Sequence, residues 1–114
     1  MTTITYKHNP TCFLIEFSGH AGFAESGKDI VCAAVSMLAN ELLYACEKAA
    51  QNGEITALHQ VQKEALVRVG FRYVQPHSIE DIITLILDCL KALEKEYHAF
   101  VRVQDMHQVQ CKVK

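Results

Sequence analysis

The alternation of apolar and polar positions at the start of the chain predicts two short β-strands. Residues 2–7 (TTITYK) and 11–18 (TCFLIEFS) are rich in β-branched and aromatic side chains, and residues 8–10 (HNP) between them favour a tight reversal. Alternate positions of the later strand share one face and are apolar: Phe13, Ile15 and Phe17. These features predict an antiparallel hairpin with one buried face.

A helical period replaces the alternation after the hairpin. From Asp29 to about Asn52, apolar residues recur at spacings of three and four: Val31, Val35, Leu38, Leu42, Cys46 and Ala49. Asp29 is a favourable N-cap, and the pair Asn52-Gly53 is a left-handed stop signal. We expect this helix to lie at the centre of the fold.

Residues 54–74 mix valine, leucine and threonine with polar residues and fit two interpretations. We favour strands over 54–61 and 65–74, with a turn at Gln62 to Glu64. The run ITALHQVQKEALV also fits a helix, because its apolar spacing does not separate the two periods.

A second long helix is predicted after Pro76. Its apolar residues form a broad stripe at helical spacing: Ile79, Ile82, Ile83, Ile86, Leu87, Leu90 and Leu93. Ser78 is the expected N-cap, and Asp81 is then the third helical residue.

The end of the chain returns to alternation and completes the layout. His98 to Val103 predicts a last strand, and the tail from Gln104 onward is either an edge strand or frayed. The order ββαββαβ predicts an α+β fold, one domain over residues 1–114, in which two long helices cover a mainly antiparallel sheet.

Composition narrows the classes of function. Half of the 114 residues are hydrophobic and 21% are charged, as in one globular domain. The net charge of −2 provides no general attraction to nucleic acid or to an anionic membrane, so neither is an expected partner. The N-terminus MTTITYKHN lacks the apolar core of a secretory signal, and no uninterrupted apolar run approaches a membrane span. We therefore expect a cytoplasmic protein.

The five cysteines are odd in number and widely scattered, which is typical neither of a disulfide framework nor of a zinc site. We expect no metal and no cofactor. Four of the cysteines are readily explained as small apolar residues of strands, helices or the tail: Cys12, Cys46, Cys89 and Cys111. Only Cys32 lies beside a glycine-rich loop.

That loop, within SGHAGFAESGKDIVCAAVS, first suggests a phosphate-binding loop. Gly22, Gly27 and Lys28 satisfy the GxxxxGK part of the motif. Asp29, however, stands where a serine or threonine hydroxyl must ligate magnesium, and its charge would lie beside the phosphates. Nucleotide binding is therefore disfavoured.

The alternative is a nucleophile with a nearby base. Cys32 falls in the first turn of a helix capped by Asp29, where free amides and the helix dipole favour the thiolate. His20, at the other end of the loop, could act first as base and then as acid. Ser36 lies one turn after Cys32 on the same face. Taken separately, each of these residues is more often structural than catalytic.

The stretch GHAGFAESGKDIVCAAVS resembles the signature of the ribosomal-processing cysteine protease family, Prp. The resemblance implies that His20 is the base and Cys32 the nucleophile, while Asp29 and Ser36 match motif positions with supporting roles. Outside this stretch the likeness is one of size and layout.

The same resemblance implies a function. Prp-like enzymes remove an apolar, aromatic N-terminal extension from a large-subunit ribosomal protein, cutting after a small residue, and the family is usually homodimeric. We expect a substrate loop that includes Gly19, Gly22, Phe23 and Gly27, is costly to order and closes over the peptide. The amides of the first helical turn are the expected oxyanion donors. A non-catalytic peptide-binding or ribosome-assembly module is the alternative.

Overall fold

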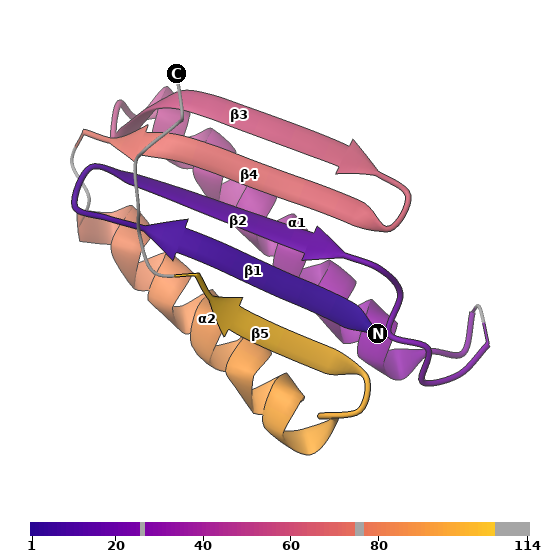
Figure 1. Ribbon diagram of the computed structural model, residues 1–114. Helices are drawn as coiled ribbons and strands as arrows, with labels where there is room; N and C mark the ends of the chain where they lie inside the picture. Colours follow the sequence, from indigo (N-terminus) through magenta and orange to yellow (C-terminus); the bar gives the residue numbers. More distant parts are fainter. Residues whose placement is uncertain (26, 75–76, 107–114) are drawn as a thin grey trace.

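The computed structural model describes residues 1–25, 27–74 and 77–106, with the side chains of residues 77 and 78 left out. The order ββαββαβ is confirmed (Figure 1), and the elements are β1 (Thr2–His8), β2 (Cys12–Ser18), α1 (Ile30–Gln51), β3 (Ile55–Lys63), β4 (Leu66–Tyr73), α2 (His77–Glu96) and β5 (Val101–Asp105).

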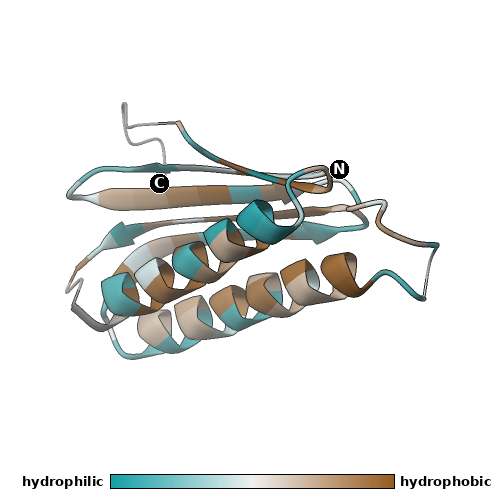
Figure 2. Ribbon diagram, turned by 90° about the horizontal axis from the view of Figure 1, so that it is seen from below, coloured by the Kyte–Doolittle hydropathy of each residue, from teal (hydrophilic) through white to brown (hydrophobic). Residues whose placement is uncertain are grey.

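The strands form one sheet in the order β3-β4-β2-β1-β5. Each neighbouring pair is antiparallel except β1 and β5, which are parallel. Both helices cover the same face of this sheet (Figure 2), so the fold has two layers. The predicted α+β class and the mainly antiparallel sheet are confirmed.

The core lies between these layers and follows the alternation of the strands. Phe13, Ile15 and Phe17 of β2 are each at most 4% exposed. They pair across the ladder with Phe71, Val69 and Val67 of β4, respectively. The apolar stripe of α1 packs against this face of the sheet. Its buried side chains include Val31, Val35, Leu42 and Cys46. Removal of these side chains from water is the main stabilising contribution to the fold.

The turn and stop residues read from the sequence correctly predicted the β1–β2 reversal and the end of α1. Asn9 Oδ1 accepts hydrogen bonds from the amides of Thr11 (2.8 Å) and Cys12 (2.9 Å), which closes the β1–β2 reversal. Helix α1 ends at Gln51, and Gly53 has a positive φ of 74°, as the Asn52-Gly53 stop requires.

Other boundaries differ from the sequence prediction. The β3–β4 turn lies at residues 64–65 rather than 62–64, because Lys63 and Leu66 still pair in the ladder. This pairing also excludes the helical alternative for the segment. Strand β5 begins at Val101 because residues 97–100 form a turn, in which the amides of Phe100 and Val101 both donate to the Tyr97 carbonyl.

The start of α2 differs from the sequence prediction, and part of the tail lies outside the described residues. Helix α2 begins at His77, so Ser78 falls inside the helix rather than at the predicted N-cap position, and its side chain is outside the described residues. Gln104 belongs to β5. The predicted role of Cys111 also lies outside the described residues.

Helix α1 meets the length and composition criteria for a membrane-spanning helix. It is long and apolar enough to cross a membrane, with 22 residues and a hydropathy of 1.4, although no uninterrupted apolar run in the sequence suggested this. Its apolar stripe, however, packs into the core of this fold. A helix that packs one face into the core of a folded domain passes the same criteria.

The cysteines that the structure describes fall into three environments. Cys46 is fully buried, and this burial, with a smaller contribution from the charge of Glu47, raises the pKa of its thiol to about 12. Cys32 and Cys89 are free and partly exposed. Cys12 is disulfide-bonded, which corrects the expectation that it is only a small apolar residue.

Candidate active site

Asp29 joins the loop to the start of α1. Its backbone is extended, with φ −85° and ψ 96°, and its Oδ1 accepts a hydrogen bond from the Cys32 amide at 2.8 Å. Its Oδ2 accepts a second from the Phe23 amide at 3.0 Å. These backbone donors, the Cys32 amide above all, hold the pKa of the Asp29 carboxyl below its usual range. The predicted N-cap is confirmed, and it also fixes one side of the loop.

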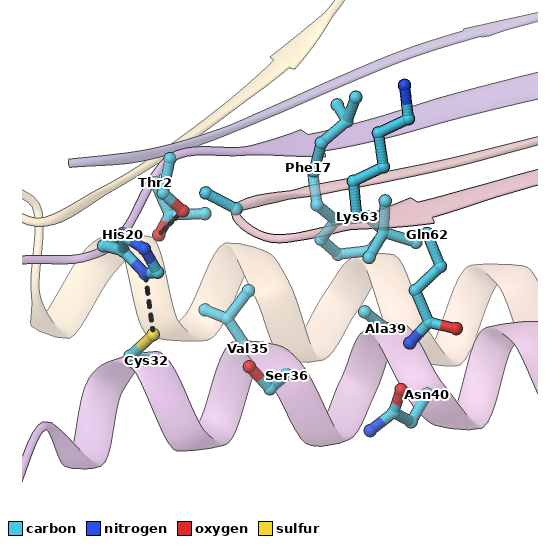
Figure 3. Close-up of a pocket in the computed structure, with 14 residues that line it drawn as sticks. Thr2, Phe17, His20, Cys32, Val35, Ser36, Ala39, Asn40, Gln62 and Lys63 are labelled. Carbon is cyan, nitrogen blue, oxygen red and sulfur yellow. Dashed lines mark hydrogen bonds between the residues drawn. The ribbon is translucent and has the colours of Figure 1, made fainter. Parts of the chain in front are cut away.

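The structure brings Cys32 and His20 together at this end of the molecule. Cys32 Sγ lies 3.9 Å from His20 Nδ1, and Figure 3 shows the imidazole directly above the sulfur. A thiol and an imidazole at this separation are within reach of proton transfer after a small side-chain movement. The two residues therefore have the arrangement of a nucleophile and its base.

The backbone before His20 is fixed by contacts that require glycine. Gly19 has a φ of +85°, and a Cβ at this position would lie 2.5 Å from the Met1 carbonyl oxygen. Its amide donates to the Ala65 carbonyl at 2.9 Å, and its carbonyl accepts from the Thr2 hydroxyl at 3.2 Å. The end of β2 thus holds the His20 main chain against two other segments of the molecule.

Two cavities meet at the cysteine and the histidine. The smaller, about 230 Å³, runs between α1 and the β3–β4 turn (Figure 3). The larger, about 620 Å³, lies on the loop side and includes Gly22, Gly27 and Asp29 in its lining. Ser36 lines both cavities together with His20 and Cys32. Ser36 is therefore placed where the sequence predicted, on the Cys32 face of the helix.

Phe23 is placed differently from the expectation. Its ring packs edge-to-face against Tyr97 at 5.6 Å and against Phe100 at 5.3 Å between centroids. It lines neither of the two cavities that contain Cys32. The loop therefore has an aromatic anchor beside the end of α2, and the substrate role predicted for it remains a prediction.

Two backbone amides of the first helical turn, where the oxyanion donors were expected, already donate hydrogen bonds to Asp29. The Cys32 amide donates to the Asp29 side chain, and the Ala33 amide donates to the Asp29 carbonyl at 3.1 Å. These two amides are engaged by the helix cap rather than directed at a cavity. An oxyanion would need other donors, and the Ser36 hydroxyl is one that lines the site.

Sequence reasoning missed one residue beside the histidine. Glu64 Oε2 lies 4.0 Å from His20 Nε2, on the β3–β4 turn. No motif predicts this proximity, because it depends on which strands pair. Within the part of the chain that the structure describes, no cluster of three or more His, Cys, Asp or Glu side chains is suited to a metal ion.

Comparison with known proteins shows the family of the chain. The sequence matches the family model described as cysteine protease Prp over residues 1–102. The chain belongs to the Prp family. It is therefore a cysteine-type endopeptidase, and the sequence resemblance is confirmed. No curated protein matches the sequence at a significant level.

Solved structures share the fold. The essential ribosomal processing protease Prp from S. aureus, with a covalently linked product peptide, is 22% identical, with a TM-score of 0.68 and coverage of 92% of this chain and 99% of that one. The same protease with a substrate peptide gives a TM-score of 0.60. SMU.848 from Streptococcus mutans is 27% identical, with a TM-score of 0.69 and coverage of 95% and 96%.

Proposed function

We propose that this Prp family member removes the N-terminal extension of a large-subunit ribosomal protein, with Cys32 as nucleophile and His20 as general base. The observation that carries this proposal is the 3.9 Å approach of Cys32 Sγ to His20 Nδ1 where two cavities meet. Two related S. aureus Prp structures, which hold a product peptide and a substrate peptide, support a peptide substrate.

The proposed reaction follows thiol-protease chemistry. His20 Nδ1 takes the proton of the Cys32 thiol, and the sulfur attacks the scissile carbonyl carbon. Collapse of the tetrahedral adduct breaks the C–N bond, leaves a thioester on Cys32, and passes the proton from His20 to the leaving amine. His20 then takes a proton from water, which hydrolyses the thioester and releases the acid product with the thiol restored.

The smaller cavity has the features of a groove for the residues next to the scissile bond. Phe17, Val35 and Ala39 give it an apolar lining, and Asn40 and Gln62 place amide side chains at its far end (Figure 3). Asn40 lies eight residues after Cys32, or roughly 12 Å along a helix, which matches about four residues of extended peptide. Side-chain amides can pair with both the N–H and the C=O groups of such a peptide.

Recognition in this groove is expected to be apolar rather than electrostatic. Its lining contains one charged residue, Lys63. The small side chains of Ser36 and Ala39 leave room for close approach of a peptide backbone, which suits a small residue at the cleavage point. We propose that aromatic side chains of the extension occupy the apolar part of the groove.

We propose that the enzyme is a cytoplasmic homodimer. Large apolar side chains are exposed on the outer surface of the two helices: Met37, Tyr44, Ile82 and Leu85. Three of them line a cavity of about 480 Å³ between α1 and α2. An exposed apolar surface of this kind is typical of a protein–protein interface. Light scattering would report a dimer for the wild type and a monomer for Leu85→Glu.

The function is tested with the extended ribosomal protein itself. The purified chain is incubated with the precursor, and the new N-terminus is sequenced. We expect a single cut after a small residue for the wild type and none for Cys32→Ser or His20→Ala, while circular dichroism shows that both variants are folded. Binding of the precursor without any cut by the wild type would instead favour the non-catalytic module.

A further inference from the structure

We propose that Glu64 is a positioning residue of this site, which orients the His20 ring and stabilises its protonated form. The inference rests on the proposed function of His20. The two ring nitrogens of the imidazole have different neighbours: Nδ1 is 3.9 Å from Cys32 Sγ and Nε2 is 4.0 Å from Glu64 Oε2. A carboxylate at one nitrogen fixes the tautomer and the direction of the other.

The backbone holds Glu64 at this position. Glu64 and Ala65 form the β3–β4 turn, and Ala65 has a left-handed backbone with φ 58°. The Ala65 carbonyl accepts the Gly19 amide at 2.9 Å, so the turn is bonded to the residue before His20. Leu66, the next residue, pairs with Ser18 at the end of β2. The acid and the histidine are thus carried by two directly hydrogen-bonded segments.

The other charged groups around His20 do not replace Glu64. Asp29 lines the larger cavity but is engaged by backbone amides. Lys63 lines the smaller cavity, and its charge opposes an imidazolium. In the loop, Lys28 and Glu25 pair with each other at 3.2 Å. Glu64 is the acidic group in contact with the ring.

Exposure sets the size of the expected effect. The Glu64 side chain is 92% exposed and His20 is 63% exposed, so water and salt screen their attraction in the free enzyme. Exposed ion pairs of this kind change an equilibrium by about 1.5- to 5-fold. A bound peptide would displace water from the larger cavity and strengthen the pair. Glu64 therefore assists the dyad and is not required for it.

The test uses the pH dependence of Cys32 alkylation by iodoacetamide, followed by mass spectrometry of the modified peptide. Loss of the acid destabilises the imidazolium that stabilises the thiolate. Alkylation in Glu64→Gln should therefore need a higher pH, by about 0.2 to 0.7 units for a 1.5- to 5-fold change. The pH needed for alkylation of Glu64→Asp should fall between those of the wild type and Glu64→Gln. The matched control Glu47→Gln removes an exposed charge roughly 22 Å along α1 and should leave the profile unchanged.

Cleavage kinetics separate this inference from the proposed function. With a peptide that spans the junction between the extension and the mature ribosomal protein, kcat should fall about 2- to 5-fold in Glu64→Gln. KM should change less, because the acid acts on the reaction through the His20 ring, although it also lines the larger cavity. The inference is wrong if the alkylation profile of Glu64→Gln superimposes on the wild type, or if Glu47→Gln shifts it equally. If the Glu64-dependent shift is present but the wild type cuts no precursor, the positioning role stands and the substrate assignment fails.

Discussion

Cys32 and Cys46 lie on the same helix and have opposite environments. Cys32 is in the first turn of α1, partly exposed, with an imidazole 3.9 Å from its sulfur. Cys46 is fully buried, and the pKa of its thiol is raised to about 12. The helix thus carries one thiol open to reaction and another that stays protonated at neutral pH. Position in the fold, rather than residue type, decides which cysteine can serve as a nucleophile.

The largest expected effect is a separation of roles between these two thiols: substitution of Cys32 should affect activity, and substitution of Cys46 should affect stability. Cys32→Ser should lower peptide cleavage by about 10³-fold or more and leave stability nearly unchanged. Cys46→Ser should keep the activity of the folded protein and lower the free energy of unfolding by about 1–3 kcal/mol, because it buries a hydroxyl. Cleavage rates and urea denaturation measure the two quantities. Equal loss of activity in both variants would contradict the comparison.

The next effect concerns what the site recognises. Replacing an aromatic residue of the extension by alanine should reduce kcat/KM by about 10- to 100-fold, because an apolar subsite loses buried contact area. Raising salt from about 0.1 to about 0.5 M should change it less than about twofold, since screening acts on charges. A steep loss with salt, combined with indifference to the aromatic residues, would indicate an electrostatic partner instead.

A third prediction tests the N-cap at the reactive end of α1. Asp29→Ala removes the acceptor of the Cys32 and Phe23 amides and should lower both stability and cleavage, whereas Asp29→Asn keeps a cap. Because folding lowers the pKa of Asp29, its charge stabilises the protein above the unfolded pKa, and this stabilisation is lost as pH falls. The wild type and Asp29→Asn should therefore converge in stability below about pH 4.

The smallest effect concerns the loop. We expect its amides at residues 19–25 to exchange faster than those of the α1 interior, and to slow when peptide binds. Phe23→Ala removes the contacts with Tyr97 and Phe100 and should speed this exchange further. Hydrogen exchange with mass spectrometry measures both changes. Full protection of the loop without peptide would show a rigid cradle rather than a lid.

The features that could be predicted from the sequence are those set by local signals. Asp29 capped α1, and Gly53 ended it, because a cap and a left-handed stop involve only neighbouring residues. Cys32 and His20 were found through their motif, at the two ends of one loop. Both predictions depend on short stretches of chain.

The features that could not be predicted depend on contacts between distant segments. The approach of Glu64 to His20 follows from the pairing of β4 with β2, and the position of Phe23 follows from the turn after α2. The β3–β4 turn was displaced because ladder pairing, rather than turn propensity, fixed it. Single-sequence periodicity carries no information on which of these segments meet.

The most direct test of the central claim is detection of the acyl-enzyme on Cys32. The chain is mixed with a peptide spanning the junction, quenched in acid within a single turnover, digested and analysed by mass spectrometry. We predict that the N-terminal product is attached as a thioester to the peptide that contains Cys32, and that hydroxylamine removes it. Cleavage without any adduct on Cys32, persisting in Cys32→Ser, would contradict the account.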